Sequence, residues 1–428
     1  MVFLNLKRST KMNIWLINPY GPIPGEGWRD YRFTMIGETL AQHGHQVTWW
    51  TANFSHHFKR FRSKDWNDLD VSPNFRIRLV PTSGYQKNIG LGRVKFEILF
   101  AWRMYQRAVK ESPPECIISV DPPQTIGFLA VRLARRFKAW LVLDVMDLWP
   151  ELFTLAFPRL LRPLAPMVLY PLYVLRRHNL RQADAITSVC DTYLEEARRL
   201  APQCQITMTI FIGIDVAEFR AMSRKLDMPS ASLRQRIGQK TPDEVWVVYA
   251  GTLGNNYDIK TLLQAAAYLK QRKSKIKIFI AGEGPLRSYV MDFIATHGST
   301  NLIYLGKLSP RELIQLYQVC DIGLCTYGPK STVAMPVKIY DYMAAGLPIV
   351  SSLRGELESL LRIRQMGIQY QAGDPKSLAE ALESLARDEK RRKTMAQNSY
   401  NTAMQFDRHV QYQKFADLIE RLCLTSGD

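Results

Sequence analysis

The stretch STVAMPVKIYDYMAAGLPIVSS (residues 331–352) predicts a loop, a short helix and a buried strand, with ligand-type side chains at the junction. Pro336 is expected at the first helical position, and Gly346 is expected to end the helix in the left-handed conformation. Lys338 and Asp341 then share one helical face near the amino end, where unpaired amides and the helix dipole attract phosphates. An ordinary charged face on a surface helix is the alternative interpretation.

Strand-like apolar segments alternate with helical patterns twice along the chain, which predicts an α/β fold of two doubly wound units. The strand candidates of the first unit are residues 13–19, 46–52, 115–121, 139–145 and 185–190, with a helix at 31–43. Those of the second unit are residues 244–251, 275–284, 301–307, 321–327 and 347–352. A ligand site is expected between the units, because the carboxyl ends of their strands face each other there.

The segment FIGIDVAEF (residues 211–219), followed by a polar stretch, marks the junction between the two units. We assign residues 12–215 to an amino-terminal Rossmann-like domain and residues 216–400 to a carboxyl-terminal one. Residues 401–428 are expected to form a final helix that can pack back towards the first domain.

Composition narrows the functional classes. The chain has 428 residues, 46% of them apolar, and a formal net charge of +18, which indicates an acidic partner such as nucleic acid, anionic lipid or a phosphorylated substrate. Six scattered cysteines without metal-ligand spacing predict reduced thiols in a cytosolic protein, and the histidines show no zinc pattern. His56 and His57 lie in a polar, basic stretch and are expected to be solvated. The first residues lack the features of a signal peptide, and Met12 is a candidate start.

Glycine-rich loops follow strand candidates in both units, at residues 19–33, 249–263 and 280–287. Glycines such as Gly25, Gly27 and Gly251 let backbone amides approach an oxygen-rich ligand. None of the loops matches the dinucleotide fingerprint G-x-G-x-x-G with its downstream acidic residue. A plain strand-to-helix turn is the alternative for each loop taken alone.

Together the motifs resemble a known family. The series YAGTLG, AGEGPLR, NLIYLGKLSPRELIQLYQVCDIGLCTY, MPVKIYDYMAAGLPIV and GIQYQAGDPKSLAEAL resembles the retaining glycosyltransferases of family four. LDVMDLWPE (residues 143–151) is similar to a motif of members that build bacterial surface polysaccharides, and FIGIDVAEF to the hinge strand of the family, with Ile212 in place of the usual Asn. The resemblance implies the GT-B fold, with the acceptor on the first domain and the nucleotide-sugar donor on the second.

The chain also departs from this family. The usual pair of glutamates is replaced by Val333 and Asp341, and the arginine that binds the diphosphate is replaced by Thr252. The resemblance implies that Asp341 contacts the ribose of the nucleotide. Contacts to the donor sugar would then fall to the backbone near Ala334 and Met335.

The resemblance implies sugar transfer from a nucleotide diphosphate with retention of configuration and without a metal or other cofactor. We assign the charge that stabilises the leaving diphosphate to Lys338, with Lys260 as the second candidate. Asp147 is expected to contact the donor sugar or the acceptor hydroxyl, and capping of the local turn is its alternative role. The further donor-binding candidates are Glu283, expected to order the loop near the base or ribose, Leu308 and Pro336.

Residues 160–177 (LLRPLAPMVLYPLYVLRR) are too short and too broken to span a bilayer, but they suit an interfacial helix on anionic lipid. Arg162, Arg176 and Arg177 would then face the membrane. Packing on the protein's own domain, with arginines reaching to water, is the alternative. The membrane interpretation favours a polyprenyl-diphosphate-linked saccharide as acceptor and a cytoplasmic protein peripheral to the inner face of the cell membrane.

Two other classes of function compete with this one. A nucleic-acid-binding protein is suggested only by charge, and no module motif supports a nucleic-acid partner. A partner subunit that keeps the fold without activity is suggested by Val333 and Thr252.

Overall fold

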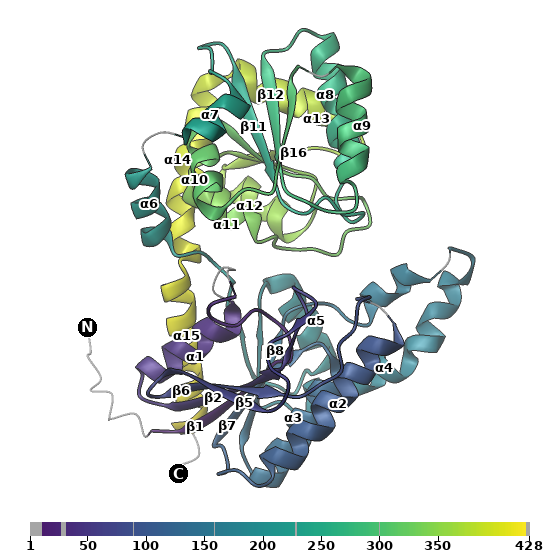
Figure 1. The fold of residues 1–428 in the computed structure, drawn as a ribbon, viewed down its shortest axis with the longest axis vertical. Coiled ribbons are helices and arrows are strands. Elements are labelled where there is room, and N and C mark those ends of the chain that lie inside the picture. The colour runs from purple at the N-terminus through teal and green to yellow at the C-terminus, as the bar shows by residue number, and fades with distance from the viewer. Residues whose placement is uncertain are drawn as a thin grey trace. The chain divides into compact units, whose positions relative to one another are not determined.

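The structure is a computed structural model that describes residues 11–26, 31–88, 90–157, 159–226, 229–298 and 300–424. It contains two compact units (Figure 1): unit 1 is Met1–Phe211 with Gln411–Asp428, and unit 2 is Ile212–Val410. The chain therefore passes between the units twice. No helix among the described residues is long and apolar enough to cross a membrane.

Unit 1 is built on an eight-stranded sheet of order β10-β9-β8-β7-β1-β2-β6-β5, in which only the β5–β6 pair is antiparallel. Its strands are β1 (Asn13–Ile17), β2 (Gln46–Ala52), β5 (Asn67–Ser72), β6 (Phe75–Val80), β7 (Cys116–Asp121), β8 (Trp140–Val145), β9 (Ala185–Ser188) and β10 (Ile206–Thr209), and β3 (Phe54–Ser55) with β4 (Arg60–Phe61) forms a small hairpin. The strand order reverses between β1 and β7, and the carboxyl ends of strands at such a switch point are where open α/β sheets bind ligands.

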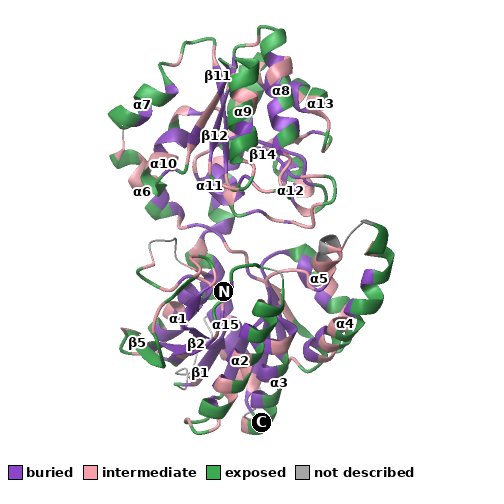
Figure 2. Cartoon of the chain, turned by 45° about the vertical axis from the view of Figure 1, so that its right-hand side comes forward, coloured by how far each residue is buried: buried purple, intermediate pink, exposed green. Residues whose placement is uncertain are grey.

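Helices cover this sheet because its inner strands are apolar on both faces; β7, for example, is buried along its whole length. Figure 2 shows the inner strands of unit 1 mostly in the purple of buried residues. The helical elements of unit 1 are α1 (Arg32–Gln42), α2 (Leu91–Ala108), α3 (Gln124–Phe137), η1 (Glu151–Ala156), η2 (Arg159–Leu164), α4 (Ala165–Arg181) and α5 (Asp191–Leu200), and α15 (Arg408–Leu424) joins them from Gln411 onwards.

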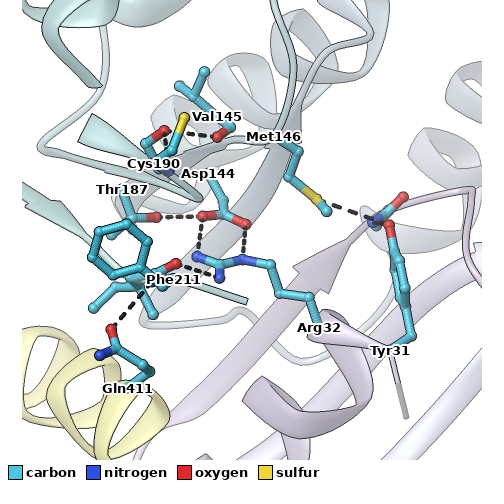
Figure 3. Close-up of polar contacts among 12 residues, drawn as sticks. Tyr31, Arg32, Asp144, Val145, Met146, Thr187, Cys190, Phe211 and Gln411 are labelled. Atoms are coloured by element: carbon cyan, nitrogen blue, oxygen red, sulfur yellow. Dashed lines mark hydrogen bonds and ion pairs between the residues drawn. The ribbon is translucent and has the colours of Figure 1, made fainter. Parts of the chain in front are cut away.

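A buried ion pair ties these elements together (Figure 3). Arg32, the first residue of α1, donates from Nε and Nη2 to the two carboxylate oxygens of Asp144 on β8, at 2.7 and 2.8 Å. Both side chains are at most 1% exposed. Thr187 on the neighbouring strand β9 donates to the same carboxylate at 2.7 Å. Removing one partner of such a pair typically costs about 3–5 kcal/mol, because the other charge stays buried.

The same arginine fixes the point where the chain leaves unit 1. Its Nη1 donates to the carbonyl of Ile210 at 2.6 Å, one residue before the end of this part of the unit. The guanidinium also lies 5.8 Å from the ring centroid of Tyr412 on α15, and the Phe211 amide donates to Gln411 Oε1 at 3.1 Å. The departing strand segment and the returning helix are thus anchored at one place.

Unit 2 has a fully parallel six-stranded sheet of order β13-β12-β11-β14-β15-β16, which is the Rossmann order. Its strands are β11 (Val245–Ala250), β12 (Ile276–Ala281), β13 (Leu302–Gly306), β14 (Ile322–Cys325), β15 (Ile349–Ser351) and β16 (Gly367–Gln369). Its helical elements are α6 (Val216–Lys225), α7 (Ala231–Ile237), α8 (Ile259–Gln271), α9 (Arg287–His297), α10 (Pro310–Val319), α11 (Lys338–Ala344), α12 (Glu356–Arg364), α13 (Pro375–Arg387), α14 (Glu389–Thr402) and η3 (Ala403–Phe406). The switch point lies between β11 and β14.

The side chain of a tyrosine on α11 lies between the two strands of that switch point. The Tyr342 hydroxyl accepts from the Ala250 amide at 3.0 Å and lies 3.3 Å from the carbonyl oxygens of Val248 and Leu324, so it bridges β11 and β14. Gly323 makes room for it, since a Cβ there would lie 2.6 Å from the tyrosine ring. The ring of Tyr342 therefore packs beneath the edge between β11 and β14.

The structure confirms the predicted α/β fold of two units and all ten predicted strands, whose ends it shifts by a few residues. Gly346 has the expected positive φ, of 70°. The expectation for Pro336 is wrong: α11 begins at Lys338, two residues later, and is preceded by a tight turn in which the Ile339 amide donates to the Pro336 carbonyl. The β5–β6 hairpin was not predicted, because its exposed, charged strand β5 lacks an apolar run.

Candidate functional site

The most unusual group in unit 2 is the side chain of Lys338. It comes from the first residue of α11, and its Nζ atom is buried although the residue as a whole is partly exposed. Three tyrosine rings surround the ammonium group, with centroids 4.0 Å (Tyr249), 5.0 Å (Tyr257) and 5.5 Å (Tyr327) from Nζ. These rings belong to β11 and to the segments after β11 and β14, so the cage stands at the switch point.

The charge of Lys338 is not neutralised within this cage. Among the residues that the structure describes, its Nζ has no hydrogen-bond partner, and the tyrosine faces supply only cation–π attraction. Burial lowers the pKa of Lys338 to about 8. A change of this size corresponds to about 3 kcal/mol in favour of the neutral amine. A bound anion would remove this penalty, so the cage is chemically suited to an anion.

Glycines in the loops after β11 and β12 allow the backbone of these loops to lie close to the Lys338 ammonium and to each other. A Cβ on Gly251 would lie 2.7 Å from Lys338 Nζ, so only glycine leaves the space that the ammonium occupies. A Cβ on Gly282 would lie 1.8 Å from the Gly251 carbonyl oxygen, and one on Gly284 would lie 2.5 Å from that of Leu253. The loops after β11 and β12 therefore pack backbone against backbone, with φ near +150° at all three glycines.

Three other residues predicted to bind the donor are exposed, and they differ in their contacts. Thr252 accepts from the Tyr249 hydroxyl through its carbonyl at 2.7 Å, while its side chain is exposed. Glu283 is exposed, its carbonyl accepts from Leu253, and its carboxylate lies 3.8 Å from Arg287. Lys260 is exposed on α8 with its Nζ 5.6 Å from the ring centroid of Tyr289, whereas the tyrosine cage holds Lys338.

Most of the other residues predicted to bind the donor are buried. Asp341 is 5% exposed, and Leu308, Ala334 and Pro336 are also buried, while Met335 is half-buried. Gly251 is described above. In unit 1, Gly25 is exposed with φ 84°, and Gly27 lies outside the described residues. The contact of Asp341 with a ribose and the backbone contacts near Ala334 stay predictions.

Asp147 of unit 1 lies just beyond β8, at the carboxyl edge of the sheet. Its Oδ1 accepts from the Leu148 amide at 2.9 Å, so it does cap the local turn. Burial raises the pKa of Asp147, and hydrogen bonds to the backbone and to Trp149 together with nearby Arg176 and Arg93 oppose that rise. Its direct contact with substrate remains a prediction.

The expectation that Arg176 faces a membrane is wrong. Its side chain is fully buried, with Nη1 3.2 Å from the Glu151 carboxylate and Nε 3.6 Å from Asp121 Oδ2 at the end of β7. Burial raises the pKa of Asp121 to about 6 despite the arginine. Arg176 therefore supports the carboxyl edge of the sheet, whereas Arg177 is exposed and Arg162 is half-buried.

Sequence reasoning missed a polar group at the unit 1 switch point. The Tyr20 hydroxyl, in the loop after β1, donates to Glu97 on α2 at 2.5 Å, and Thr125 on α3 donates to the other oxygen at 3.3 Å. Arg93 completes the group, 3.2 Å from Glu97, and burial raises the pKa of that carboxyl. The i,i+4 spacing of Arg93 and Glu97 was the available signal, but it is also typical of a solvated helix face.

Comparison with known proteins agrees with this arrangement. Residues 233–402 match the family model of glycosyl transferases group 1, and residues 31–207 match that of a glycosyl transferase 4-like domain. The chain is 23% identical over 208 residues to the putative glycosyltransferase EpsD of Bacillus subtilis, covering 48% of this chain and 52% of EpsD. It is 27% identical over 165 residues to the N,N'-diacetylbacillosaminyl-diphospho-undecaprenol alpha-1,3-N-acetylgalactosaminyltransferase of Campylobacter jejuni, covering 38% and 41%.

Solved structures share the fold over nearly the whole chain. Sucrose-phosphate synthase from Thermosynechococcus elongatus superimposes with a TM-score of 0.72 at 17% identity, over 97% of this chain and 100% of that one. HepE from Anabaena in complex with UDP-glucose gives a TM-score of 0.65 at 16% identity, over 96% and 100%. The sequence matches to the curated relatives, by contrast, span only about half of those proteins' length or less.

We predict that Lys338→Met stabilises the free protein and weakens its affinity for nucleoside diphosphates. Removing an unneutralised buried charge should raise the melting temperature of unit 2 by a few degrees at pH 7, since about 1 kcal/mol corresponds to about 2–4 °C in a domain of this size. Losing a charge-assisted contact should weaken UDP or GDP binding by about 10- to 100-fold. Calorimetry measures both, with the exposed Lys390→Met as matched control. A variant that melts lower and binds normally would show that the ammonium is structural.

The affinity for nucleoside diphosphates should also fall as the pH rises above about 8. The free protein has lost the Lys338 proton there and must take it up on binding, so the dissociation constant should approach a tenfold rise per pH unit. Cys325 and Tyr249 do not titrate in this window, because burial raises the pKa of Cys325 to about 12 and that of Tyr249 well above its usual value. Calorimetry at pH 9 in two buffers of different ionisation enthalpy should count nearly one proton taken up, and none with Lys338→Met.

Proposed function

Because the chain belongs to the GT-B glycosyltransferases that join a glycosyl transferase 4-like domain to a group 1 domain, we propose that it transfers a sugar from a nucleoside diphosphate sugar to an acceptor hydroxyl with retention of anomeric configuration. Unit 2 binds the donor and unit 1 binds the acceptor in this proposal. The acceptor is a lipid-linked saccharide of bacterial surface polysaccharide assembly.

The observation that carries the proposal is the unneutralised Lys338 ammonium in its tyrosine cage at the switch point of a Rossmann-ordered sheet. Negative charge grows on the diphosphate as it leaves the sugar. A fixed cation that is already desolvated stabilises this charge without having to reorganise, and it requires no nucleophile on the protein. The close-packed glycine loops let backbone amides share the same task.

The identity of the donor is proposed from the structural neighbours. HepE from Anabaena is described in complex with UDP-glucose and with UDP, so uridine diphosphate sugars are the first donors to test. Asp341 is the proposed ribose contact. On the acceptor side, the Campylobacter relative is named for an undecaprenol-diphosphate acceptor, which favours a polyprenyl-diphosphate-linked saccharide here.

An exposed apolar surface on unit 1 supports a membrane-associated acceptor. In η2 and α4 the exposed apolar residues are Leu160 (93%), Leu161 (49%), Leu164 (50%), Met167 (71%), Val168 (59%), Tyr170 (65%) and Val174 (49%). Exposed Arg177 and half-buried Arg162 lie in the same two elements. Apolar side chains beside arginines fit the acyl boundary and head groups of an anionic bilayer. We therefore propose that the protein is peripheral to the inner face of the cell membrane.

The activity is tested on the purified chain in two steps. Thermal shift against uridine, guanosine and adenosine diphosphate sugars should show stabilisation by at least one donor, about 2.7 kcal/mol at a hundredfold excess over the dissociation constant. That donor should then transfer its sugar to a polyprenyl-diphosphate-linked saccharide, and proton coupling constants of the product should show retained configuration. Donor binding without transfer or hydrolysis would favour an inactive partner subunit instead.

Membrane docking should depend on the surface of η2 and α4. The triple variant Leu160→Ser, Met167→Ser and Val168→Ser should lose most co-sedimentation with phosphatidylglycerol vesicles, because it removes three aliphatic groups that are each more than half exposed. The matched control is Ile363→Ser with Met404→Ser, which are 68% and 51% exposed on unit 2. Arg162→Gln with Arg177→Gln should weaken docking mainly at low salt. Wild-type protein that ignores these vesicles would refute the membrane proposal.

A further inference from the structure

Two basic side chains of unit 1 meet at Asn88, beside the amino end of α2, and the proposed donor site and membrane surface leave them unused. Lys59 lies in the turn before β4 with a left-handed backbone (φ 52°), and its Nζ donates to Asn88 Oδ1 at 2.6 Å. Arg93 lies in the first turn of α2 and donates from Nη1 to the Asn88 carbonyl at 2.9 Å. A left-handed backbone conformation is uncommon outside glycine. The turn therefore keeps Lys59 in a conformation that costs conformational free energy.

Two tyrosines and a histidine join them. Lys59 Nζ lies 4.3 Å from the ring centroid of Tyr85, and Arg93 Cζ lies 4.9 Å from that of Tyr20. His56 contacts both tyrosines, since its Nδ1 hydrogen-bonds with the Tyr85 hydroxyl and its ring lies 5.3 Å from that of Tyr20. His56 is thus half-buried and packed, and the expectation of a solvated histidine is wrong. We call His56, Lys59 and Arg93 the basic cluster.

Among the residues that the structure describes, the basic cluster has more positive charge than its neighbours neutralise. Arg93 is paired with Glu97, but the described contacts of Lys59 are with a neutral amide and an aromatic ring. Burial and the nearby Arg93 lower the pKa of Lys59. Burial, Lys59 and Arg93 together lower the pKa of His56 to about 4. Repulsion among cations that remain partly accessible to solvent is relieved by a bound anion.

The surroundings indicate what kind of anion fits. Exposed apolar side chains begin in the same first turn of α2 and continue along one face of the helix: Leu91 (87%), Val94 (49%), Ile98 (55%) and Trp102 (55%). This stripe extends for about 16 Å at the rise of an α-helix. An amphiphile that carries phosphate at one end and an apolar chain at the other matches the cluster and the stripe together.

We infer that the basic cluster binds the phosphate that joins the acceptor to its lipid, with the start of the lipid chain along the exposed stripe of α2. Lys59 and Arg93 supply charge-assisted donors. We assign the Tyr85 hydroxyl as the donor to His56 Nδ1, an assignment that places the imidazole proton on Nε2 as a third donor. This inference rests on the proposed function and specifies how its acceptor is recognised.

The test uses the full chain with Lys338→Met, so that the proposed donor site competes about 10- to 100-fold more weakly for a diphosphate. Calorimetry with farnesyl diphosphate should show saturable binding. His56→Gln with Lys59→Gln should weaken it at least tenfold, whereas Lys59→Arg should retain it because the charge is kept. Exposed Lys110→Gln, just beyond α2, is the matched control, and unchanged melting temperatures establish that the variants are folded.

The other outcomes identify the alternative sources of phosphate. Inorganic pyrophosphate that binds as tightly as farnesyl diphosphate would overturn the lipid part of the inference. Equal affinity of wild type and the double variant for farnesyl diphosphate would overturn the site itself, and a loss confined to phosphatidylglycerol vesicles would assign the cluster to membrane head groups instead. Because the binding assay contains no donor, intact farnesyl diphosphate binding in a chain that transfers no sugar would refute only the proposed function.

Discussion

The buried pair between Arg32 and Asp144 is the constraint on which unit 1 depends. A single guanidinium meets the carboxylate of β8, the carbonyl of Ile210 where the chain leaves the unit, and the ring of Tyr412 on the returning helix. Two ions at most 1% exposed are tolerated because their hydrogen bonds replace those to water. The two passages of the chain between the units are therefore fixed, on the unit 1 side, to the centre of its sheet.

Unit 2 contains a buried charge that, unlike Arg32, has no partner of opposite charge among the described residues. Lys338 is desolvated as Arg32 is, but among the described residues its ammonium has tyrosine faces for neighbours and no carboxylate. A paired charge stabilises one arrangement of the chain, whereas an unneutralised one lowers stability until an anion arrives. Stability given up at one position and recovered on binding is typical of functional sites. The glycines in the loops after β11 and β12 carry no side chain that would occupy the space around the ammonium or separate the two loops.

Both units concentrate unusual polar groups where the strand order of the sheet reverses. In unit 2 this is the edge between β11 and β14, with Lys338. In unit 1 it is the edge between β1 and β7, with Tyr20, Glu97 and Asp121. Loops leave in opposite directions at such an edge, so backbone does not fill the space and side chains line it. These two edges are therefore where the proposed function places the donor and the acceptor.

The sequence by itself determined ten of the strands, the two-unit organisation and the place of Lys338 near the start of a helix, because apolar runs, glycine turns and helix starts are local patterns. Only the tertiary structure decided that Arg176 is buried, that Tyr342 bridges two strands and that Lys260 lies apart from the tyrosine cage. It also brought Tyr20 to Glu97, 77 residues away. Such groups acquire their burial and partners from segments distant in sequence, and a local pattern contains no information about which distant residue will neutralise, cover or expose a charge.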